Sequence, residues 1–287
     1  MGLFWGALAF LPGCAHAQPA DLFYERAVMS AADQRCRLFA PDLAAALAAA
    51  TAQARGAALR AGTAPYVLIQ SEKTARARAA TADCRSADVA TAAARVRGAF
   101  AGFAKLTRLT YDGDVAGWAA DRNLYRTARW RLSQETAFGG DRMAFGLAGT
   151  QGPGALIAVG RFADGAQPYA AHLVMRDQTR SAGPYLSRFS VGSTAGLPLP
   201  QRLPPAAAQK AFTAAARAPA GPDLLPKGAP SGWAFRFPDS VAVELAQLDP
   251  REAVAVDFLF PGDMVRRAYV EVGDFAAGRA FLQLASR

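Results

Sequence analysis

The sequence predicts an α+β protein in which an N-terminal α-helical bundle is followed by a mainly antiparallel β-sheet domain with flanking helices. From Ala20 to about Thr110 the chain is rich in Ala, Leu, Arg and Gln, which favour helices, and nearly lacks β-branched alternation. After Tyr111, Gly-Asp turns, aromatic residues and alternating apolar residues take over. We therefore expect a helical domain over residues 18–111 and an α+β domain over residues 112–287.

Residues 1–17 have the features of a secretory signal peptide. A short apolar run over residues 3–11 is followed by Ala15-His16-Ala17, which fits an A-x-A cleavage site. The run is too short to cross a hydrocarbon core of about 30 Å. We therefore expect cleavage after Ala17, a periplasmic or secreted location and no transmembrane span, although the usual Lys or Arg near the start is missing. A buried N-terminal strand and lipid attachment at Cys14 are the alternatives.

Two cysteines remain after this cleavage, Cys36 and Cys84. In an oxidising compartment such a pair favours a disulfide, and closing a loop of this length would contribute about 4 kcal/mol to stability. The alternative is two buried thiols. A redox-active pair is disfavoured because the C-x-x-C spacing is missing.

Four helices are expected in the N-terminal domain, over about 21–38, from Pro41 to Gly62, over about 65–81, and after Ser86. Pro41 suits a first helical turn, and Gly62 suits a C-terminal cap. Ser86 is a typical N-cap. The fourth helix is expected to turn a set of apolar residues toward a core, namely Val89, Val96, Phe100, Phe103 and Leu106. The disulfide would tie the first helix to the approach of the fourth, as suits a compact bundle.

Strands are expected next along the chain. Trp130 and Leu132 alternate with polar residues, which predicts a strand with one buried face. Gly139-Gly140-Asp141 is typical of a hairpin loop. The strand after it carries Met143, Phe145 and Leu147. Further strands are expected over 155–162, 169–176 and 185–191, with a turn at Asp164-Gly165.

The C-terminal part is expected to mix helices and strands. A short helix over 206–217 is predicted between Pro-rich linkers near 196–205 and 218–230. The remaining expected elements are a strand over 233–237, a helix over 241–248 with Asp239 as N-cap, a strand with Val254, Val256, Phe258 and Phe260 on one face, a type II turn at Pro261-Gly262, a returning strand over 268–272, and a last helix over 275–285 capped by Asp274.

The familiar catalytic motifs are missing from this sequence. Without residues 1–17 one histidine remains, His172, in the middle of a predicted strand. A Ser-His-Asp or Cys-His site would have to include it, and a histidine on the sheet surface is the simpler interpretation. No G-x-S-x-G, H-E-x-x-H, Walker or dinucleotide-binding motif is present. We expect no metal, since zinc ligands are too few, and no cofactor.

Carboxylates are the remaining candidates for catalysis, because glycosidases need only two of them at the right separation. Asp112 and Asp114 are the first candidates, with Glu135 and Asp141 nearby in sequence. The same Asp-Gly series is typical of turns, and an EF-hand loop would need further ligands. No catalytic pair is therefore assigned.

The strongest functional signal is the net charge of +9, with lysine only at positions 73, 105, 210 and 227. Arginine beside aromatic residues suits phosphates, sulfates and uronic acids, which it binds by bidentate and stacking contacts. The predicted binding residues are Trp118, Arg122, Tyr125, Arg126, Arg129, Trp130 and Arg131. A second cluster is Arg266, Arg267 and Tyr269. The alternative is a solvated strand face in an arginine-rich chain.

Together these observations predict an exported periplasmic or cell-envelope protein that binds without catalysis. Its expected partner is an anionic envelope polymer or another envelope protein, and nucleic acid is disfavoured by the compartment. One alternative is a carboxylate-dependent hydrolase acting on a cell-wall glycan. Another is an assembly factor whose Ala-rich bundle packs on a second helical protein.

Overall fold

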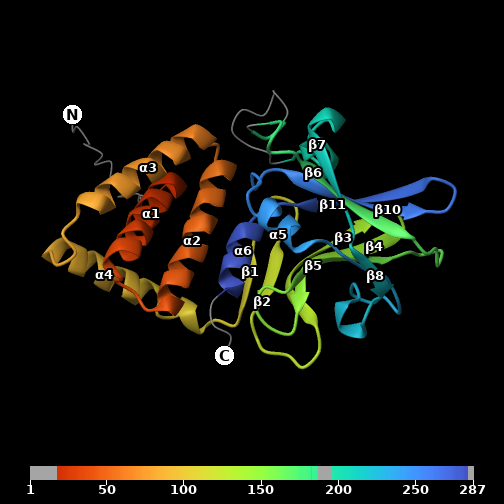
Figure 1. The fold of residues 1–287 in the computed structure, drawn as a ribbon, viewed down its shortest axis with the longest axis horizontal. Coiled ribbons are helices and arrows are strands. Elements are labelled where there is room, and N and C mark those ends of the chain that lie inside the picture. Colours follow the sequence, from red (N-terminus) through yellow and green to blue (C-terminus); the bar gives the residue numbers. More distant parts are fainter. Residues whose placement is uncertain (1–17, 182, 187–195, 284–287) are drawn as a thin grey trace, which may run out of the picture.

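The computed structural model describes residues 18–181, 183–186 and 196–283. In this part of the chain four α-helices come first and form one end of the molecule (Figure 1). They are α1 (Pro19–Cys36), α2 (Pro41–Arg60), α3 (Pro65–Thr81) and α4 (Ala87–Phe100). The first three begin with proline, whose fixed φ suits the first turn, and Ser86 caps α4 by accepting a hydrogen bond from the Val89 N–H.

A disulfide joins Cys36 to Cys84, with the two Cα atoms 5.6 Å apart. It connects the last residue of α1 to the segment just before α4, as the sequence predicts. Between α1, α2 and α3 lies a small separate core that contains Phe23, Leu59 and Leu68. The helices are therefore held by a covalent crosslink at one place and by apolar packing at another.

The fourth helix buries less than its pattern predicts. Of its residues only Ala93 is fully buried, while Val89, Val96 and Phe100 are half-buried. Leu106, which follows the short 3-10 helix η1 (Phe103–Lys105), is 41% exposed. The prediction that Leu106 faces the core is therefore wrong, because η1 interrupts the helical period on which the prediction depended.

The rest of the described chain forms two antiparallel sheets. The larger has seven strands in the order β1-β2-β3-β4-β5-β9-β8. They are β1 (Arg108–Tyr111), β2 (Trp118–Asp121), β3 (Arg129–Phe138), β4 (Asp141–Gly149), β5 (Ala155–Arg161), β8 (Ala216–Pro219) and β9 (Trp233–Arg236). The smaller has four strands in the order β11-β10-β6-β7. They are β6 (Ala170–Arg176), β7 (Gln209–Thr213), β10 (Ala253–Phe260) and β11 (Met264–Glu271).

Tight turns set several of these pairings. Gly139, with φ of +60°, and Gly140 form the two-residue loop between β3 and β4, and Phe138 pairs with Asp141 across it. Gly262 supplies the positive φ of +74° that the β10–β11 turn needs. The predicted hairpins are thus present. The expected strand over 185–191 falls mostly outside the described residues.

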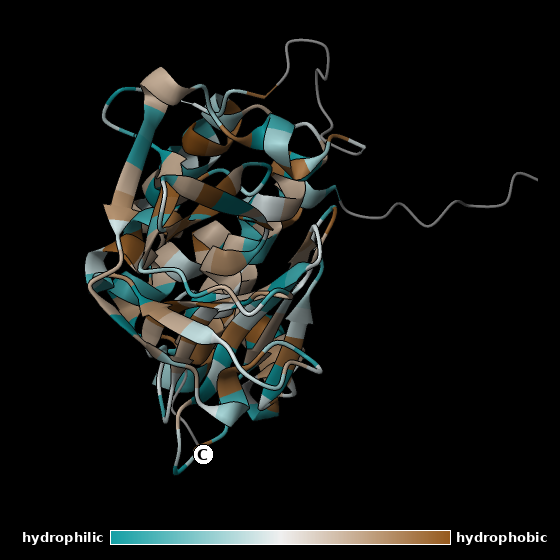
Figure 2. Cartoon of the chain, turned by 90° about the vertical axis from the view of Figure 1, so that its right-hand side faces the viewer, coloured by the Kyte–Doolittle hydropathy of each residue, from teal (hydrophilic) through white to brown (hydrophobic). Residues whose placement is uncertain are grey.

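The main core lies between the two sheets. It includes Phe145 and Phe235 of the larger sheet and Val256 and Phe258 of the smaller one, all fully buried. Phe162 packs edge-on against Phe258 with ring centroids 5.1 Å apart. Bands of hydrophobic and hydrophilic colour interchange along the ribbons, as expected for strands that have one buried face (Figure 2).

Two further helices complete the fold, α5 (Asp239–Leu245) and α6 (Phe275–Leu282). Helix α6 lies between α2 and the sheets (Figure 1). Ala46 and Ala49 of α2 belong to the same core as the sheet residues. The helical end and the sheets therefore share one apolar core. The division at residues 111 and 112 stays a prediction, although β1 already begins at Arg108.

The predicted helix over 206–217 is wrong. Residues Ala206–Ala208 form the 3-10 helix η3, after which the chain forms β7 and β8. Strand β7 pairs with β6, and β8 pairs with β9. Alanine favours a helix in isolation, but here pairing with β6 and β9 satisfies the backbone hydrogen bonds and overrides that preference.

The two Pro-rich segments pack against the sheets in the described part of the chain. The first contains η2 (Leu199–Arg202), in which Arg202 is completely buried. The second contains η4 (Pro222–Leu224), in which Leu224 is buried against Ala148 and Val159. Among the described helices none combines the length and apolar character that a membrane span requires.

Candidate functional site

The predicted arginine and aromatic residues do not all reach the surface. Trp118 on β2 is fully buried, donates from Nε1 to the Val272 carbonyl at 3.0 Å, and packs against Phe275 with ring centroids 5.1 Å apart. Arg122 is buried too, and its guanidinium lies 5.4 Å from the Phe281 ring centroid. Both side chains join the sheet to α6, so their contacts are internal to the fold.

Arg131 is buried because of a β-bulge. Trp130 pairs with Ala148 and Leu132 with Leu147, so Arg131 is an extra residue in β3 and the simple alternation breaks. Its guanidinium donates to the carbonyls of Asn123 and Gly152. Burial lowers the pKa of Arg131, an effect that Asp121 and Tyr125 oppose.

The other predicted binding residues lie nearer the surface and mostly have protein partners. Arg129 forms an ion pair with Asp223 at 3.1 Å and stacks 4.9 Å from the Tyr125 ring centroid. Trp130 donates from Nε1 to the Leu224 carbonyl at 3.1 Å. Arg126 is exposed. Because Trp118, Arg122 and Arg131 are buried, the seven residues cannot form one ligand surface in this structure.

The second predicted cluster is electrostatically compensated. Arg266 forms ion pairs with Asp141 at 3.1 Å and with Asp164 at 2.5 Å, and Arg267 pairs with Asp257 at 2.5 Å. The hydrogen bonds from Arg266 lower the pKa of Asp164 to about 2. These arginines therefore hold the hairpin and its neighbours together.

Of the candidate carboxylates, Asp112 is exposed, while Asp114, Glu135 and Asp141 have partners within the fold. Asp114 forms an ion pair with Arg202 at 3.1 Å. The neighbouring Glu271 is fully buried and accepts hydrogen bonds from the backbone N–H groups of residues 114, 115 and 116 at 2.8–2.9 Å. His172 is half-buried on β6, opposite Asp257 in the sheet. Among the described residues no cluster of His, Cys, Asp and Glu is suited to hold a metal ion.

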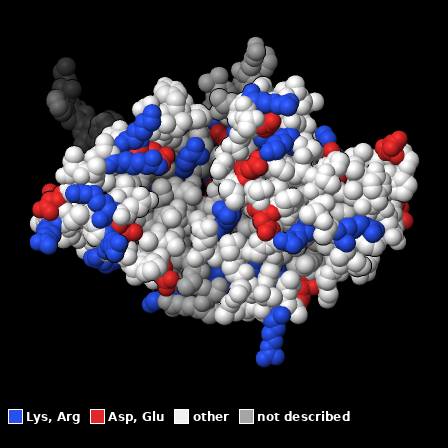
Figure 3. Space-filling model, viewed as in Figure 1, with Lys and Arg blue, Asp and Glu red and all other residues white. Residues whose placement is uncertain are grey.

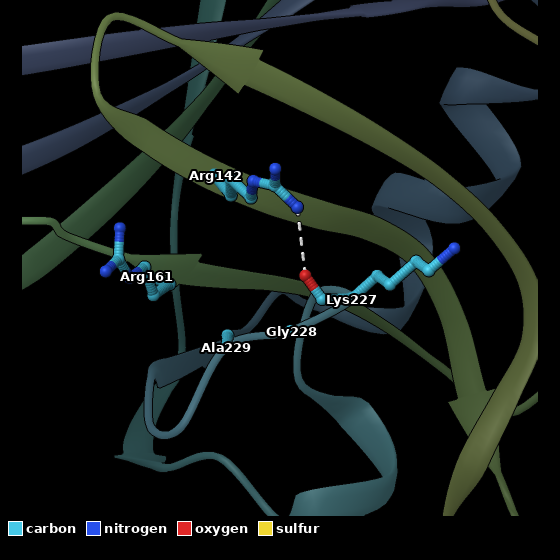
Figure 4. A pocket seen from close by; sticks show the side chains of 5 residues that line it. All are labelled: Arg142, Arg161, Lys227, Gly228 and Ala229. Carbon is cyan, nitrogen blue, oxygen red and sulfur yellow. Dashed lines mark hydrogen bonds between the residues drawn. The ribbon is translucent and has the colours of Figure 1, made fainter.

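A basic depression lies on the larger sheet, at a place the sequence did not indicate. Its volume is about 300 Å³, and Arg142, Arg161, Lys227, Gly228 and Ala229 line it. We call it the basic depression. Arg142 on β4 and Arg161 on β5 are directly opposite each other in the ladder. The loop that follows η4 supplies the other three residues (Figure 4).

Arg142 anchors this loop, because its Nη1 donates to the Lys227 carbonyl at 3.0 Å (Figure 4). Glu135, in the adjacent strand, accepts a long 3.4 Å hydrogen bond from the Lys227 backbone N–H. Gly228, with φ of +75°, lets the chain turn along the rim. The depression is therefore built by a strand pair and an anchored loop that are far apart in sequence.

The charge of the basic depression is not balanced by ion pairs. Within the described residues no carboxylate lies within 4.0 Å of the charged nitrogens of Arg142, Arg161 or Lys227. Like charges directly opposite in a sheet destabilise it, so this arrangement is a cost to the fold. Arg161 donates from Nη1 to the Gly140 carbonyl at 3.4 Å, as Arg142 does to the Lys227 carbonyl. An anion in the depression would lower the repulsion and accept from the remaining N–H groups.

Comparison of the sequence with protein-family models and curated proteins, and of the fold with solved structures, finds no match. The function of this chain is therefore inferred from its own geometry.

Proposed function

We propose that this protein is exported to the cell envelope and binds an anionic envelope polymer, without catalysis, through the basic depression. The observation that carries the proposal is the cross-strand pair Arg142 and Arg161, which lines a depression of about 300 Å³ without a carboxylate partner in the described chain. A guanidinium group presents a planar fork of donors that suits phosphate, sulfate or carboxylate groups.

The rest of the molecule supports this proposal. The net charge of +9 attracts polyanions at long range. On the face seen in Figure 3, Lys and Arg are spread over both the helical end and the sheets, so charge on this face alone would direct a polymer to no single place. The disulfide is compatible with an oxidising compartment. The proposed export requires residues 1–17 to be a signal peptide that is cleaved, which N-terminal sequencing of native protein would test.

The test compares two double variants with the same loss of charge. Arg142→Ala with Arg161→Ala removes both arginines of the basic depression and leaves Lys227. Arg78→Ala with Arg95→Ala removes two exposed arginines from α3 and α4. Each protein is pelleted with lipopolysaccharide or peptidoglycan across a series of salt concentrations. We expect the first variant to bind about tenfold more weakly at low salt, and the second to stay within about twofold of the wild-type protein.

Two results would contradict the proposal. One is failure of the wild-type protein to bind either polymer at any salt concentration. The other is an equal loss of binding in both double variants, which would assign the attraction to net charge rather than to the depression.

A further inference from the structure

A second, smaller cavity lies where the helical end meets the sheets. It has a volume of about 190 Å³ and is formed by α2, by the segment after α5, and by the corner between β11 and α6. Sites for drug-sized ligands occupy roughly 300–1,000 Å³. This cavity therefore suits a much smaller molecule.

The lining of this cavity is mainly apolar and made of short side chains. Ala52 of α2 lines the cavity together with Leu248, Val272 and Ala277, and the last three are almost completely buried. Such walls favour an aliphatic group, because they offer apolar surface without competing donors or acceptors.

Two charged side chains line the same cavity, Arg55 and Asp274. Both oxygens of Asp274 already accept hydrogen bonds from Arg60, at 2.8 and 3.0 Å, and its side chain is only 2% exposed. Arg55 is half-buried, and no carboxylate in the described chain forms an ion pair with it. Arg55 is thus the charged group of the cavity that is available to a ligand.

Two carboxylates lie near Asp274, and neither of them lines the cavity. Glu271 and Asp112 both lie close enough to raise the pKa of Asp274. Glu271 is held by Arg202 and by three backbone N–H groups, and Asp112 is exposed. With Asp274 paired to Arg60, the lining carries one unpaired positive charge at Arg55. A ligand with one carboxylate and a short hydrocarbon chain matches both features.

We propose that this cavity binds a short-chain aliphatic carboxylate, whose carboxylate pairs with Arg55 and whose hydrocarbon chain lies against Ala52, Leu248 and Val272. The proposal is independent of the basic depression. Here the aliphatic chain and the carboxylate are both recognised, whereas an envelope polymer requires only the anionic groups.

The experiment uses butyrate and its uncharged isostere butyramide as probes. Saturation-transfer NMR with the full mature chain measures the binding of each. We expect butyrate to bind at least about tenfold more tightly than butyramide, because a charge-assisted hydrogen bond to Arg55 is lost with the amide. Arg55→Gln should abolish this preference, while Arg95→Gln, an exposed arginine on α4, should keep it.

A second variant keeps the test decisive if Arg55→Gln does not fold. Ala276→Leu extends a half-buried side chain of the lining into the cavity and should reduce the binding of both probes. The Arg142→Ala and Arg161→Ala double variant should retain butyrate binding, which separates the two sites. Equal binding of butyrate and butyramide to the wild-type protein, absence of saturation transfer, or an unchanged preference in folded Arg55→Gln would each overturn the proposal.

Discussion

Asp274 precedes α6 and holds the helical end to the sheets. Its side chain makes no capping hydrogen bond to α6, and both of its carboxylate oxygens instead accept from Arg60 at the end of α2. Gly56 makes this approach possible, since a Cβ atom there would lie 2.5 Å from Asp274 Oδ1. The predicted N-cap role of Asp274 is therefore replaced by a buried ion pair across the molecule.

Breaking this pair should make stability strongly dependent on pH. Burial raises the pKa of Asp274 while Arg60 opposes the rise, so Arg60→Met should raise that pKa further. We expect the variant to lose about 3 kcal/mol at pH 7. The loss should shrink as the pH falls toward the unfolded pKa of about 3.9, because the buried carboxyl then becomes neutral.

Urea unfolding at pH 7 and pH 5 checks this expectation. Arg78→Met, on the exposed side of α3, serves as control and should change stability by less than about 0.5 kcal/mol at both pH values. A deficit of Arg60→Met that is the same at pH 7 and pH 5 would show that lost packing, and not the buried charge of Asp274, causes it.

At the scale of elements, the disulfide compensates for the modest burial in α4. Helix α4 buries only Ala93 completely and is joined to α1 by Cys36–Cys84. The crosslink spans 48 residues of sequence. In the chain-entropy model a loop of this length contributes about 4 kcal/mol by restricting the unfolded state.

Replacing both cysteines by serine should therefore lower the free energy of unfolding by about 2–4 kcal/mol. Denaturant unfolding with and without dithiothreitol measures the effect. The reductant should destabilise the wild-type protein by a similar amount and leave the Cys36→Ser, Cys84→Ser variant unchanged. Insensitivity of the wild-type protein to complete reduction would refute the stabilising role.

At the scale of the whole molecule, the helical end and the sheets share one core. Ala46 and Ala49 of α2 lie in the same apolar cluster as Phe145 of the larger sheet. The Arg60–Asp274 pair spans the same junction. Parts joined in this way lose stability together when either one unfolds.

We therefore expect one cooperative unfolding transition. The tryptophans of residues 18–287 are Trp118, Trp130 and Trp233, which all lie in the larger sheet, so fluorescence reports on the sheets. Far-ultraviolet circular dichroism is dominated by the helices. The two probes should give the same denaturation midpoint. Separate midpoints would instead favour two independently folding domains divided near residues 111 and 112.

Local signals in the sequence determined much of the chain's organisation. Proline at the helix starts, Ser86 as a cap, and Gly139-Gly140 as a hairpin loop act within a few residues, so they can be interpreted without the fold. The disulfide was predictable because two cysteines remain once Cys14 is removed with the expected signal peptide.

Only the tertiary structure decided where the charged residues lie. Arg131 is buried by a bulge that its own alternating pattern conceals, and Arg142, Arg161 and Lys227 meet through strand register and an anchored loop. After η3, the segment predicted as a helix forms β7 and enters β8, because β6 and β9 supply its hydrogen-bond partners. Burial and pairing depend on contacts between residues far apart in the chain, whereas composition and spacing describe only near neighbours.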